Sequence, residues 1–385
     1  MKFIHTGDWH LGKIVNQVSM LEDQRYVLEQ FVALVAAERP DAVILSGDLY
    51  DRSIPPAEAV ELMDKTLTAL AGELKTPVLA VAGNHDSPDR IDFGRRLFCD
   101  QQLYIEGRIH LPLTPVTIRD EYGPVQCYLL PYAHPSEVRT LLGDETIKTQ
   151  EDAFRALTAA LSPASNSERR ILITHGYFQG GNQLETSESE RPLNIGGSDI
   201  VSAQLLDGFQ YVALGHLHGP QQVTNKSYYA GSLLKYSFSE ARQKKSVAIV
   251  EMGADGSVTL RRETLTPQRD MRCIKGALSA LLDPAVYAET NTDDYLAVTL
   301  TDEGEILDPI GQLRSVYPHV MVVEREQRPL NPLYSSVSLG EVRTLPADKL
   351  FKSFYEEMTG NTFTTERAAV LTETMENIAR REREA

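Results

Sequence analysis

The sequence predicts an α/β fold in which a parallel sheet is covered by helices. Short apolar runs alternate with stretches of helical periodicity in the N-terminal part of the chain, and each run ends abruptly in small or polar residues. The chain has 385 residues, of which 42% are hydrophobic and 24% are charged. These values are ordinary for a globular protein with two or three domains and a sizeable core, so we do not expect a disordered chain.

Three buried strands separated by two helices are expected first. The strands are the apolar parts of KFIHTGD, AVILSGD and VLAVAGNHD. Apolar residues at helical spacing mark the helices between them: Leu21, Leu28, Phe31 and Val35 before Pro40, and then Val60, Met63, Leu67 and Leu70. Further strands are expected at ILITHG, at YVALGHLH (211–218) and at SVAIVEM (246–252). Strands and helices in this alternation are typical of a parallel sheet.

The character of the sequence changes after residue 266, so we expect the first domain to span 1–266. Residues 267–330 predict a small α+β accessory domain, with a helix near 278–289 and strands near 295–301 and 319–325. Proline, serine and glycine interrupt any periodicity over 331–345, which predicts a linker. Residues 346–385 predict two helices joined at Gly360 and Asn361. Their apolar residues are Leu350, Phe351, Phe354, Tyr355 and Met358 in the first helix, and Val370, Leu371, Met375 and Ile378 in the second.

Cysteine usage and the lack of long apolar segments predict a cytoplasmic protein. The three cysteines, Cys99, Cys127 and Cys273, are far apart and fit neither a disulfide framework nor a cysteine-based zinc site. No apolar stretch is long enough to cross a membrane, and no basic segment followed by an apolar run opens the sequence. We therefore expect no membrane partner.

The net charge of −16 restricts how an anionic substrate can bind. Proteins that bind nucleic acid mainly by covering phosphates with lysine and arginine are usually basic overall. An anionic substrate must therefore be attracted by a local positive centre, and bound metal ions would provide one.

Potential metal ligands follow the apolar runs at the point where each run ends. In open α/β sheets, ligands bind at the carboxyl ends of the strands, and residues two apart in an extended stretch can face the same way. The candidate ligands are Asp8, His10, Asp48, Asn84, His175, His216 and His218. Seven oxygen and nitrogen ligands without a thiolate are too many for one tetrahedral zinc ion. They suit two divalent ions with one shared carboxylate, and the oxygen content favours manganese over iron or zinc.

Charge balance at this site favours a phosphoester substrate. Two divalent ions bring four positive charges, of which the carboxylates of Asp8 and Asp48 remove two, while neutral histidines and Asn84 remove none. The remaining positive charge can be matched by a phosphodiester and a hydroxide. An acidic protein would in this way have a strongly electropositive pocket.

The ordered motifs D-x-H, GD-x-x-D, GNHD, a histidine after an apolar strand, and GHLH resemble the calcineurin-like metallophosphoesterase superfamily over roughly residues 1–250. HTGDWHLGK, SERP (189–192) and YYAGSLLKYSFSE resemble its SbcD family of bacterial nuclease subunits more closely. The resemblance implies a β-sandwich flanked by helices, with a small capping domain and C-terminal helices.

The same resemblance implies roles for the ligands and partners for the chain. Asp8, His10, Asp48 and His218 would hold one metal, and Asp48, Asn84, His175 and His216 the other, with Asp48 as the bridge. The implied partners are DNA, a second copy of the chain, and an SbcC-like coiled-coil ATPase bound through the C-terminal helices. The chain itself contains no G-x-x-x-x-G-K-[ST] phosphate loop, so an ATP-driven step must come from elsewhere. A DNA substrate would make the protein nucleoid-associated.

We predict that His85, beside Asn84, acts in catalysis without binding metal, as a general acid or as a group that stabilises the transition state. Asp86 is expected to hold its imidazole and to favour the protonated form. Candidate substrate contacts, each weighed against an ordinary packing or surface role, are Trp9, Asp51, Arg52, Arg90 and Arg191.

Two functions fit the motifs. The first is a manganese-dependent DNA nuclease, acting as exonuclease and endonuclease on double-stranded ends and hairpins in repair and recombination. The alternative is a metallophosphoesterase acting on small nucleotides or phosphoproteins, because the same two-metal chemistry serves both. The accessory domain and the C-terminal helices favour the nuclease, since a small-molecule phosphatase would not need them.

Overall fold

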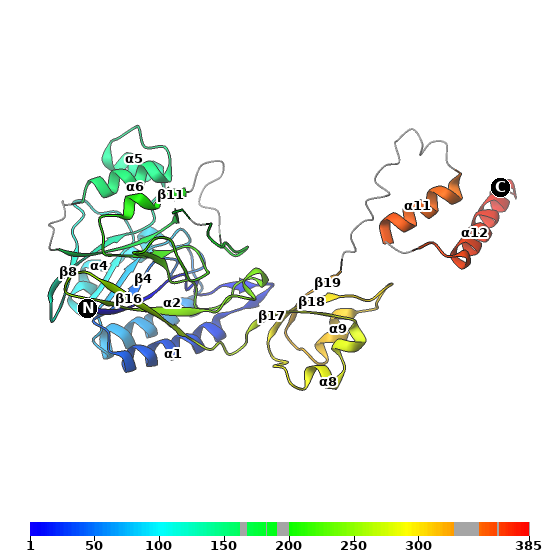
Figure 1. Cartoon of the computed structure of the whole chain (residues 1–385), viewed down its shortest axis with the longest axis horizontal. Helices are drawn as coiled ribbons and strands as arrows, with labels where there is room; N and C mark the ends of the chain where they lie inside the picture. The colour runs from blue at the N-terminus through cyan, green and yellow to red at the C-terminus, as the bar shows by residue number, and fades with distance from the viewer. Residues whose placement is uncertain (162–167, 182, 191–199, 327–345, 360–361, 385) are drawn as a thin grey trace.

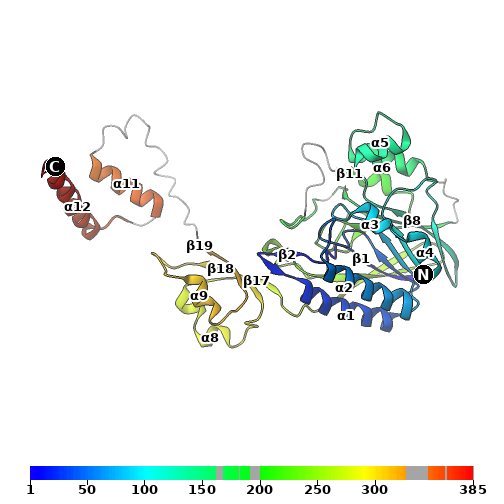
Figure 2. The same ribbon diagram turned by 180° about the vertical axis from the view of Figure 1, so that it is seen from behind.

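Two six-stranded β-sheets packed face to face form the main body of the protein. The computed structural model describes residues 1–161, 168–181, 183–190, 200–326, 346–359 and 362–384. Helices cover the outer face of each sheet, which gives four layers in the order helix, sheet, sheet, helix (Figures 1 and 2).

The first sheet contains the predicted parallel strands. Its order is β16 (Val258–Thr264), β15 (Ser246–Met252), β1 (Lys2–Thr6), β4 (Ala42–Leu45), β5 (Val78–Val81) and β6 (Leu103–Glu106). Strands β1, β4, β5 and β6 are parallel, whereas β15 and β16 are antiparallel to their neighbours. Helix α1 (Leu21–Glu38) and helix α2 (Ala57–Leu67), which continues as a π-helix over Thr68–Glu73, cover its outer face. The predicted alternation of strands and helices is confirmed here.

The second sheet supplies the other half of the sandwich. Its order is β13 (Gln221–Gln222), β14 (Ser227–Tyr229), β12 (Tyr211–Gly215), β9 (Arg169–His175), β8 (Gly123–Leu130) and β7 (Val116–Asp120). Strands β14, β12, β9 and β8 are parallel. Helices α5 (Pro135–Leu142) and α6 (Gln150–Ala159) cover its outer face. Shorter elements are β2 (Ile14–Val15), β3 (Val18–Ser19), α3 (Pro88–Asp92), α4 (Arg95–Phe98), β10 (Tyr177–Gln179), β11 (Ile200–Ser202) and 3₁₀ turns at Cys99–Gln101, Ala203–Leu206 and Phe238–Glu240.

Side-chain alternation along the strands produces separate cores on the two faces of each sheet. Phe3 of β1 belongs to the core between the sheets, where its ring meets that of Tyr211 of β12 edge-on at 5.1 Å between centroids. The next residue, Ile4, belongs instead to the core beneath α1 and α2. The carboxyl ends of β1, β4, β5, β9 and β12 can therefore direct side chains into the space between the sheets.

The accessory domain is built on a parallel three-stranded sheet, β17 (Met271–Gly276), β18 (Tyr295–Leu300) and β19 (Val320–Arg325). The helix expected near 278–289 is wrong as a single element, because two short helices, α7 (Leu278–Leu281) and α8 (Pro284–Tyr287), occupy it. Pro284 cannot donate a helical hydrogen bond, and the Asp283 side chain caps α8 by accepting from the Ala285 N–H. Helix α9 (Pro309–Arg314) completes the domain.

The accessory domain contacts α1 through polar side chains, of which Asp23 and Tyr295 are buried. The Tyr295 hydroxyl donates to Asp23 Oδ2 at 2.7 Å, and Arg269 pairs with Glu22 at 2.9 Å. Tyr295 and Met271 also belong to the core beneath α1 and α2. The first domain and the accessory domain therefore share apolar packing as well as ion pairs.

Two helices, α11 (Ala347–Thr359) and α12 (Thr365–Glu384), follow and contact each other. Both helices predicted after residue 346 are thus present. The predicted linker at 331–345 and the predicted turn at Gly360 and Asn361 lie outside the described residues. Among the helices of the described ranges, none is long and apolar enough to cross a membrane.

Candidate metal centre

The seven predicted ligands come together between the two sheets. Asp8 and His10 follow β1, Asp48 follows β4 and Asn84 follows β5, all in the first sheet; His175 ends β9, and His216 and His218 follow β12, in the second. Asn84 is half-buried, and the other six side chains are buried. Because neither sheet holds the whole set, the site exists only where the two sheets meet.

The backbone around these residues is held in an uncommon conformation. Asp8, His10 and Asp48 have φ of 50°, 46° and 48°, and His216 has φ of 116°. A positive φ is costly for residues other than glycine, and such strain persists only where the surrounding structure enforces it. Here the His216 N–H donates to Asp8 Oδ1 at 2.9 Å and the Asp8 N–H donates to the Gly47 carbonyl at 3.0 Å. The strand ends therefore hold one another in place.

Glycines beside the ligands allow the strand ends to approach. Gly47 has φ of 97°, and a Cβ at this position would overlap the His175 ring. A Cβ at Gly215 would overlap the carbonyl oxygen of Ser46. These two positions require glycine for the His175 and Asp48 side chains to meet.

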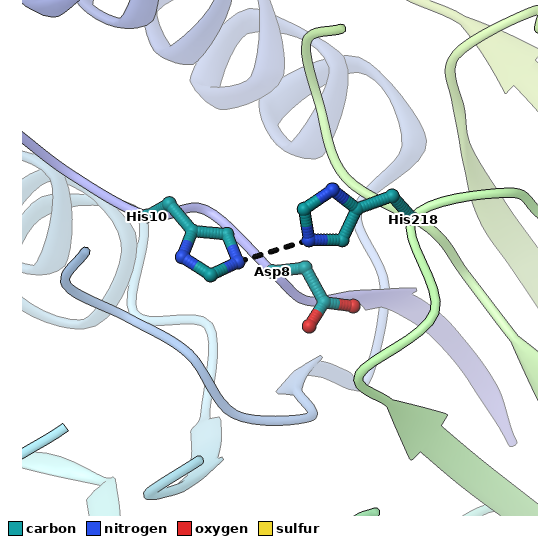
Figure 3. A group of neighbouring side chains, drawn as sticks. All are labelled: Asp8, His10 and His218. Carbon is teal, nitrogen blue, oxygen red and sulfur yellow. Dashed lines mark hydrogen bonds between the residues drawn. The ribbon is translucent and has the colours of Figure 1, made fainter. Parts of the chain in front are cut away.

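The first half of the centre is formed by Asp8, His10 and His218 (Figure 3). His10 Nε2 lies 3.0 Å from His218 Nε2 and 3.5 Å from Asp48 Oδ2. Asp8 Oδ2 is buried without a hydrogen-bond partner. Three ligand atoms thus face a common point without protein donors that satisfy them.

The second half is formed by Asp48, Asn84 and His175. His175 Nδ1 donates to the Ser46 carbonyl at 3.0 Å, so its lone pair is on Nε2. That Nε2 lies 2.9 Å from Asn84 Oδ1 and 3.5 Å from Asp48 Oδ2, both of which are acceptors. The His216 ring lies 5.5 Å from the His175 ring between centroids. Asp48 Oδ2 is therefore within reach of both halves.

This arrangement fits divalent cations. Facing lone pairs are unfavourable unless a cation lies between them. Burial and then the charge of Asp48 raise the pKa of Asp8, although the His216 N–H and the charge of Lys245 oppose the shift. A cation bound at this carboxylate would favour its ionised form. Burial lowers the pKa of His10 and of His175, and lowers that of His216 to about 3. The imidazoles of His10, His175 and His216 are consequently neutral at neutral pH and available as ligands.

His85 lies beside the centre, but its partner differs from the expected one. Its Nδ1 donates to the main-chain oxygen of Asp51 at 2.8 Å, and its ring meets that of His10 edge-on at 4.7 Å. The expectation that Asp86 holds this imidazole is wrong, because Asp86 accepts instead from the N–H groups of Leu49, Tyr50 and Gly83. Asp86 thereby joins the loop after β4 to the loop after β5, and its position is structural.

Of the candidate substrate contacts, the structure places Asp51 at the centre. Asp51 Oδ1 pairs with Lys13 at 2.8 Å and lies 3.6 Å from His10 Nδ1. The prediction that Trp9 contacts substrate is wrong. Trp9 is 1% exposed, donates to Thr6 Oγ1 at 3.0 Å and packs edge-on against Phe31, so it cannot line a substrate site.

The arginine candidates remain predictions. Arg52 is exposed on the loop after β4, and Arg90 is exposed on helix α3, which follows β5. Arg191 lies outside the described residues.

Sequence reasoning missed the buried polar groups behind the ligands. Ser46 positions His175 through its carbonyl oxygen, and Glu240 contacts His218 from a position 22 residues further along the chain. No local spacing links such pairs. Glu240 does lie in the segment YYAGSLLKYSFSE, which carried part of the family resemblance without a role for any residue in it.

Known proteins resemble the chain over both of its domains. Residues 1–220 match the model of the calcineurin-like phosphoesterase family, and residues 267–359 match a model described as the type 5 capsule protein repressor C-terminal domain. The chain is 35% identical over 361 residues to the SbcD subunit of the SbcCD nuclease of Staphylococcus epidermidis, which covers 93% of this chain and 94% of the relative. The crystal structure of TT1561 of Thermus thermophilus is 14% identical, with a TM-score of 0.37, and covers 69% of this chain and 99% of that chain.

The phosphoesterase match spans the strand ends that carry all seven ligands, and the match to the nuclease subunit extends through the accessory domain. The chain therefore belongs to the calcineurin-like phosphoesterases and, within them, to the SbcD family.

Proposed function

We propose that the chain is a metal-dependent DNA nuclease, which hydrolyses phosphodiester bonds as an exonuclease and endonuclease on double-stranded ends and hairpins in DNA repair and recombination. The observation that carries the proposal is the pair of facing ligand sets, His10 with His218 and His175 with Asn84, on either side of Asp48. The similarity to a nuclease subunit along nearly the whole chain supports DNA as the substrate.

Two divalent cations bound at these ligands would neutralise a phosphate and activate water for attack. The protein's part is to hold the ligands neutral or singly charged and to keep them between the sheets. We propose manganese as the physiological metal, because the ligands are carboxylate, amide and imidazole groups and include no thiolate. His85, at the edge of the centre, is proposed to stabilise or protonate the leaving oxygen.

Substrate preference of the purified chain tests this proposal. Linear duplex DNA, a DNA hairpin, a single strand and a chromogenic phosphomonoester are each supplied with manganese or magnesium. We expect manganese-dependent cleavage of the duplex and the hairpin, and none by Asp48→Asn. Hydrolysis of the monoester alone would instead support a phosphoesterase acting on small nucleotides or phosphoproteins.

We further propose that α11 and α12 bind an SbcC-like coiled-coil ATPase. Both helices carry exposed apolar side chains: Leu350, Phe351, Phe354 and Met358 on α11, and Val370 and Ile378 on α12. Apolar helix faces of this kind are a common way to bind a partner. If the protein cleaves chromosomal DNA together with this partner, it would be located at the nucleoid.

A homodimer is also proposed, formed through the short helices of the phosphoesterase domain. Phe93 and Leu97, at α3 and α4, are 79% and 77% exposed, which is unusual for large apolar side chains. Phe93→Glu with Leu97→Glu should convert a dimer into a monomer in size-exclusion chromatography with light scattering. Leu307→Glu, at an apolar position of the accessory domain that is 89% exposed, is the control. An unchanged mass in the double variant would contradict this interface.

A further inference from the structure

A buried network of charged and polar groups lies behind His218, on the side away from His10. His218 Nδ1 is 2.7 Å from Ser189 Oγ and 3.2 Å from Glu240 Oε1, and the Ser189 hydroxyl also donates to Glu240 Oε1. Glu240 ends the 3₁₀ turn Phe238–Glu240 and is fully buried. A carboxylate buried this deeply must be compensated by partners, because burying an unpaired charge is costly.

Lys245 pairs with this carboxylate and ties it to the backbone of the ligand. Its Nζ lies 2.5 Å from Glu240 Oε2 and donates to the His218 carbonyl at 2.8 Å and to Ser232 Oγ at 2.9 Å. Lys245 is 6% exposed. Apolar replacement of a buried ion pair is often neutral or stabilising, so stability alone does not account for it.

The hydrogen bonds around Nδ1 determine where His218 carries its proton. A carboxylate paired with lysine can only accept, and the single proton of the Ser189 hydroxyl is directed to Glu240. Both partners of Nδ1 are therefore acceptors, so the proton of the neutral ring lies on Nδ1. The lone pair is then on Nε2, the atom that lies 3.0 Å from His10 Nε2 (Figure 3).

We propose that Glu240, held by Lys245, is a positioning residue that fixes the Nδ1–H form of His218 and thereby prepares Nε2 to bind a divalent cation beside Asp8 and His10. The proposal rests on the metal centre of the proposed function. A carboxylate partner also makes the imidazole a stronger ligand. His175, in contrast, is oriented by the neutral carbonyl of Ser46, so the two halves of the centre receive different support.

Metal binding by the full-length chain tests this proposal without reference to DNA cleavage. Manganese binding is followed by electron paramagnetic resonance of the free ion and by calorimetry, for the wild type, Glu240→Gln and the control Asp294→Asn. Asp294 is a comparable buried carboxylate, paired with Arg272 in the accessory domain. Removal of an outer carboxylate partner typically weakens metal binding by about 10- to 100-fold. We expect that loss at one of two sites in Glu240→Gln and none in Asp294→Asn.

The ring proton provides a second readout, which is taken on the wild type. In ¹⁵N-histidine-labelled, metal-free wild type, with the signal assigned by its loss in His218→Gln, His218 should be protonated on Nδ1. A proton on Nε2 would overturn the proposal, and so would wild-type manganese affinity at both sites in Glu240→Gln. Equal weakening in Asp294→Asn would overturn it as well. A chain that shows both expected results but cleaves no DNA would refute the proposed nuclease function and leave this inference standing.

Discussion

His85 lies at the edge of the centre, in a cluster with His10 and Asp51, and we assign it a catalytic role rather than that of a ligand. Its backbone N–H donates to Asp48 Oδ1 at 2.9 Å, and its ring Nδ1 donates to the Asp51 carbonyl. We therefore expect His85→Ala to lower turnover by about 100-fold, in the range of a lost general acid or base. Elemental analysis of the same preparation should still give two metals per chain. A variant that has lost metal would contradict the role assigned to His85.

His5 predicts a pH dependence of stability that is separate from the metal ligands. It is buried between the sheets, with Nδ1 2.9 Å from the Tyr211 hydroxyl and Nε2 3.0 Å from Ser46 Oγ. Burial lowers the pKa of His5 from 6.5 to about 3. In this interval the unfolded chain binds a proton that the folded chain excludes, so the free energy of unfolding decreases as the pH falls below 6.5.

The decrease attributable to this residue is up to about 1.4 kcal/mol per pH unit. Urea denaturation of metal-free protein between pH 7 and pH 5 should show a shallower decline for His5→Gln than for the wild type. Gln can retain a hydrogen bond to Tyr211 or Ser46, so the fold is kept. Parallel declines for the two proteins would show that His5 does not contribute.

Single residues were predictable where chemistry and strand position coincide. Asp8 and Asp48 carry ligand chemistry and directly follow buried strands, so the motif pattern identifies them. Trp9 occupies the same kind of position, but its burial depends on contact with Phe31 of a helix, which the local pattern does not contain. The role of Asp86 depends on three backbone N–H groups of neighbouring loops, and no residue type signals these.

At the scale of elements, α11 presents apolar residues that no other element of the described chain covers to a large extent. Phe354 and Met358 are 57% and 67% exposed and lie one helical turn apart. Phe354→Glu with Met358→Glu should abolish co-purification with the cognate SbcC-like ATPase, because charges would replace the apolar contact. Lys352→Glu, which lies on the other side of the helix by its spacing, should leave co-purification intact.

Retention of the ATPase by the double variant would place the interface elsewhere. Circular dichroism of both variants should show unchanged helix content, which separates loss of contact from loss of structure. The nuclease domain does not include these residues, so cleavage by the isolated chain should be unaffected.

Elements with strong periodicity were predicted, and those governed by single residues were not. The apolar stripe of α1 places Leu28, Phe31 and Val35 in the core as expected. In the second helix, Met63 is buried, but Val60 is 45% exposed although it belongs to the same expected stripe. In the accessory domain, Pro284 divides an apparently continuous helical pattern, because a missing N–H outweighs hydrophobic spacing.

At the scale of the whole molecule, the metal should stabilise the fold, because its ligands come from both sheets. Saturating manganese at about 100 times its dissociation constant adds about 2.7 kcal/mol per site to the free energy of unfolding. Addition of a chelator should accordingly lower the melting temperature of the wild type. The melting temperature of Asp48→Asn should respond much less. An equal response of the two proteins would mean that the cation acts at another place.

The local hydrophobic patterns in the sequence do not predict the number of sheets. Alternating strands and helices correctly predict the parallel pairing of β1, β4 and β5. The runs at 171–176 and 211–218 have the same character, yet they belong to a second sheet that faces the first. Periodicity reports which strands are buried but does not identify the sheet they join, and only the family resemblance implied a sandwich.

The position of the site across the sandwich has a consequence for control of the enzyme. Cations held by Asp8 and Asp48 of the first sheet and by His175 and His218 of the second would link the two sheets. Any sliding of one sheet past the other would pull these ligands out of alignment. The accessory domain is anchored to α1 on the first sheet and, through Asp270 and Lys235, to the segment that links β14 of the second sheet to β15 of the first. A displacement of that domain would thus disturb α1 and also the segment that carries Glu240, which contacts His218. Cleavage would then depend on how the accessory domain is held.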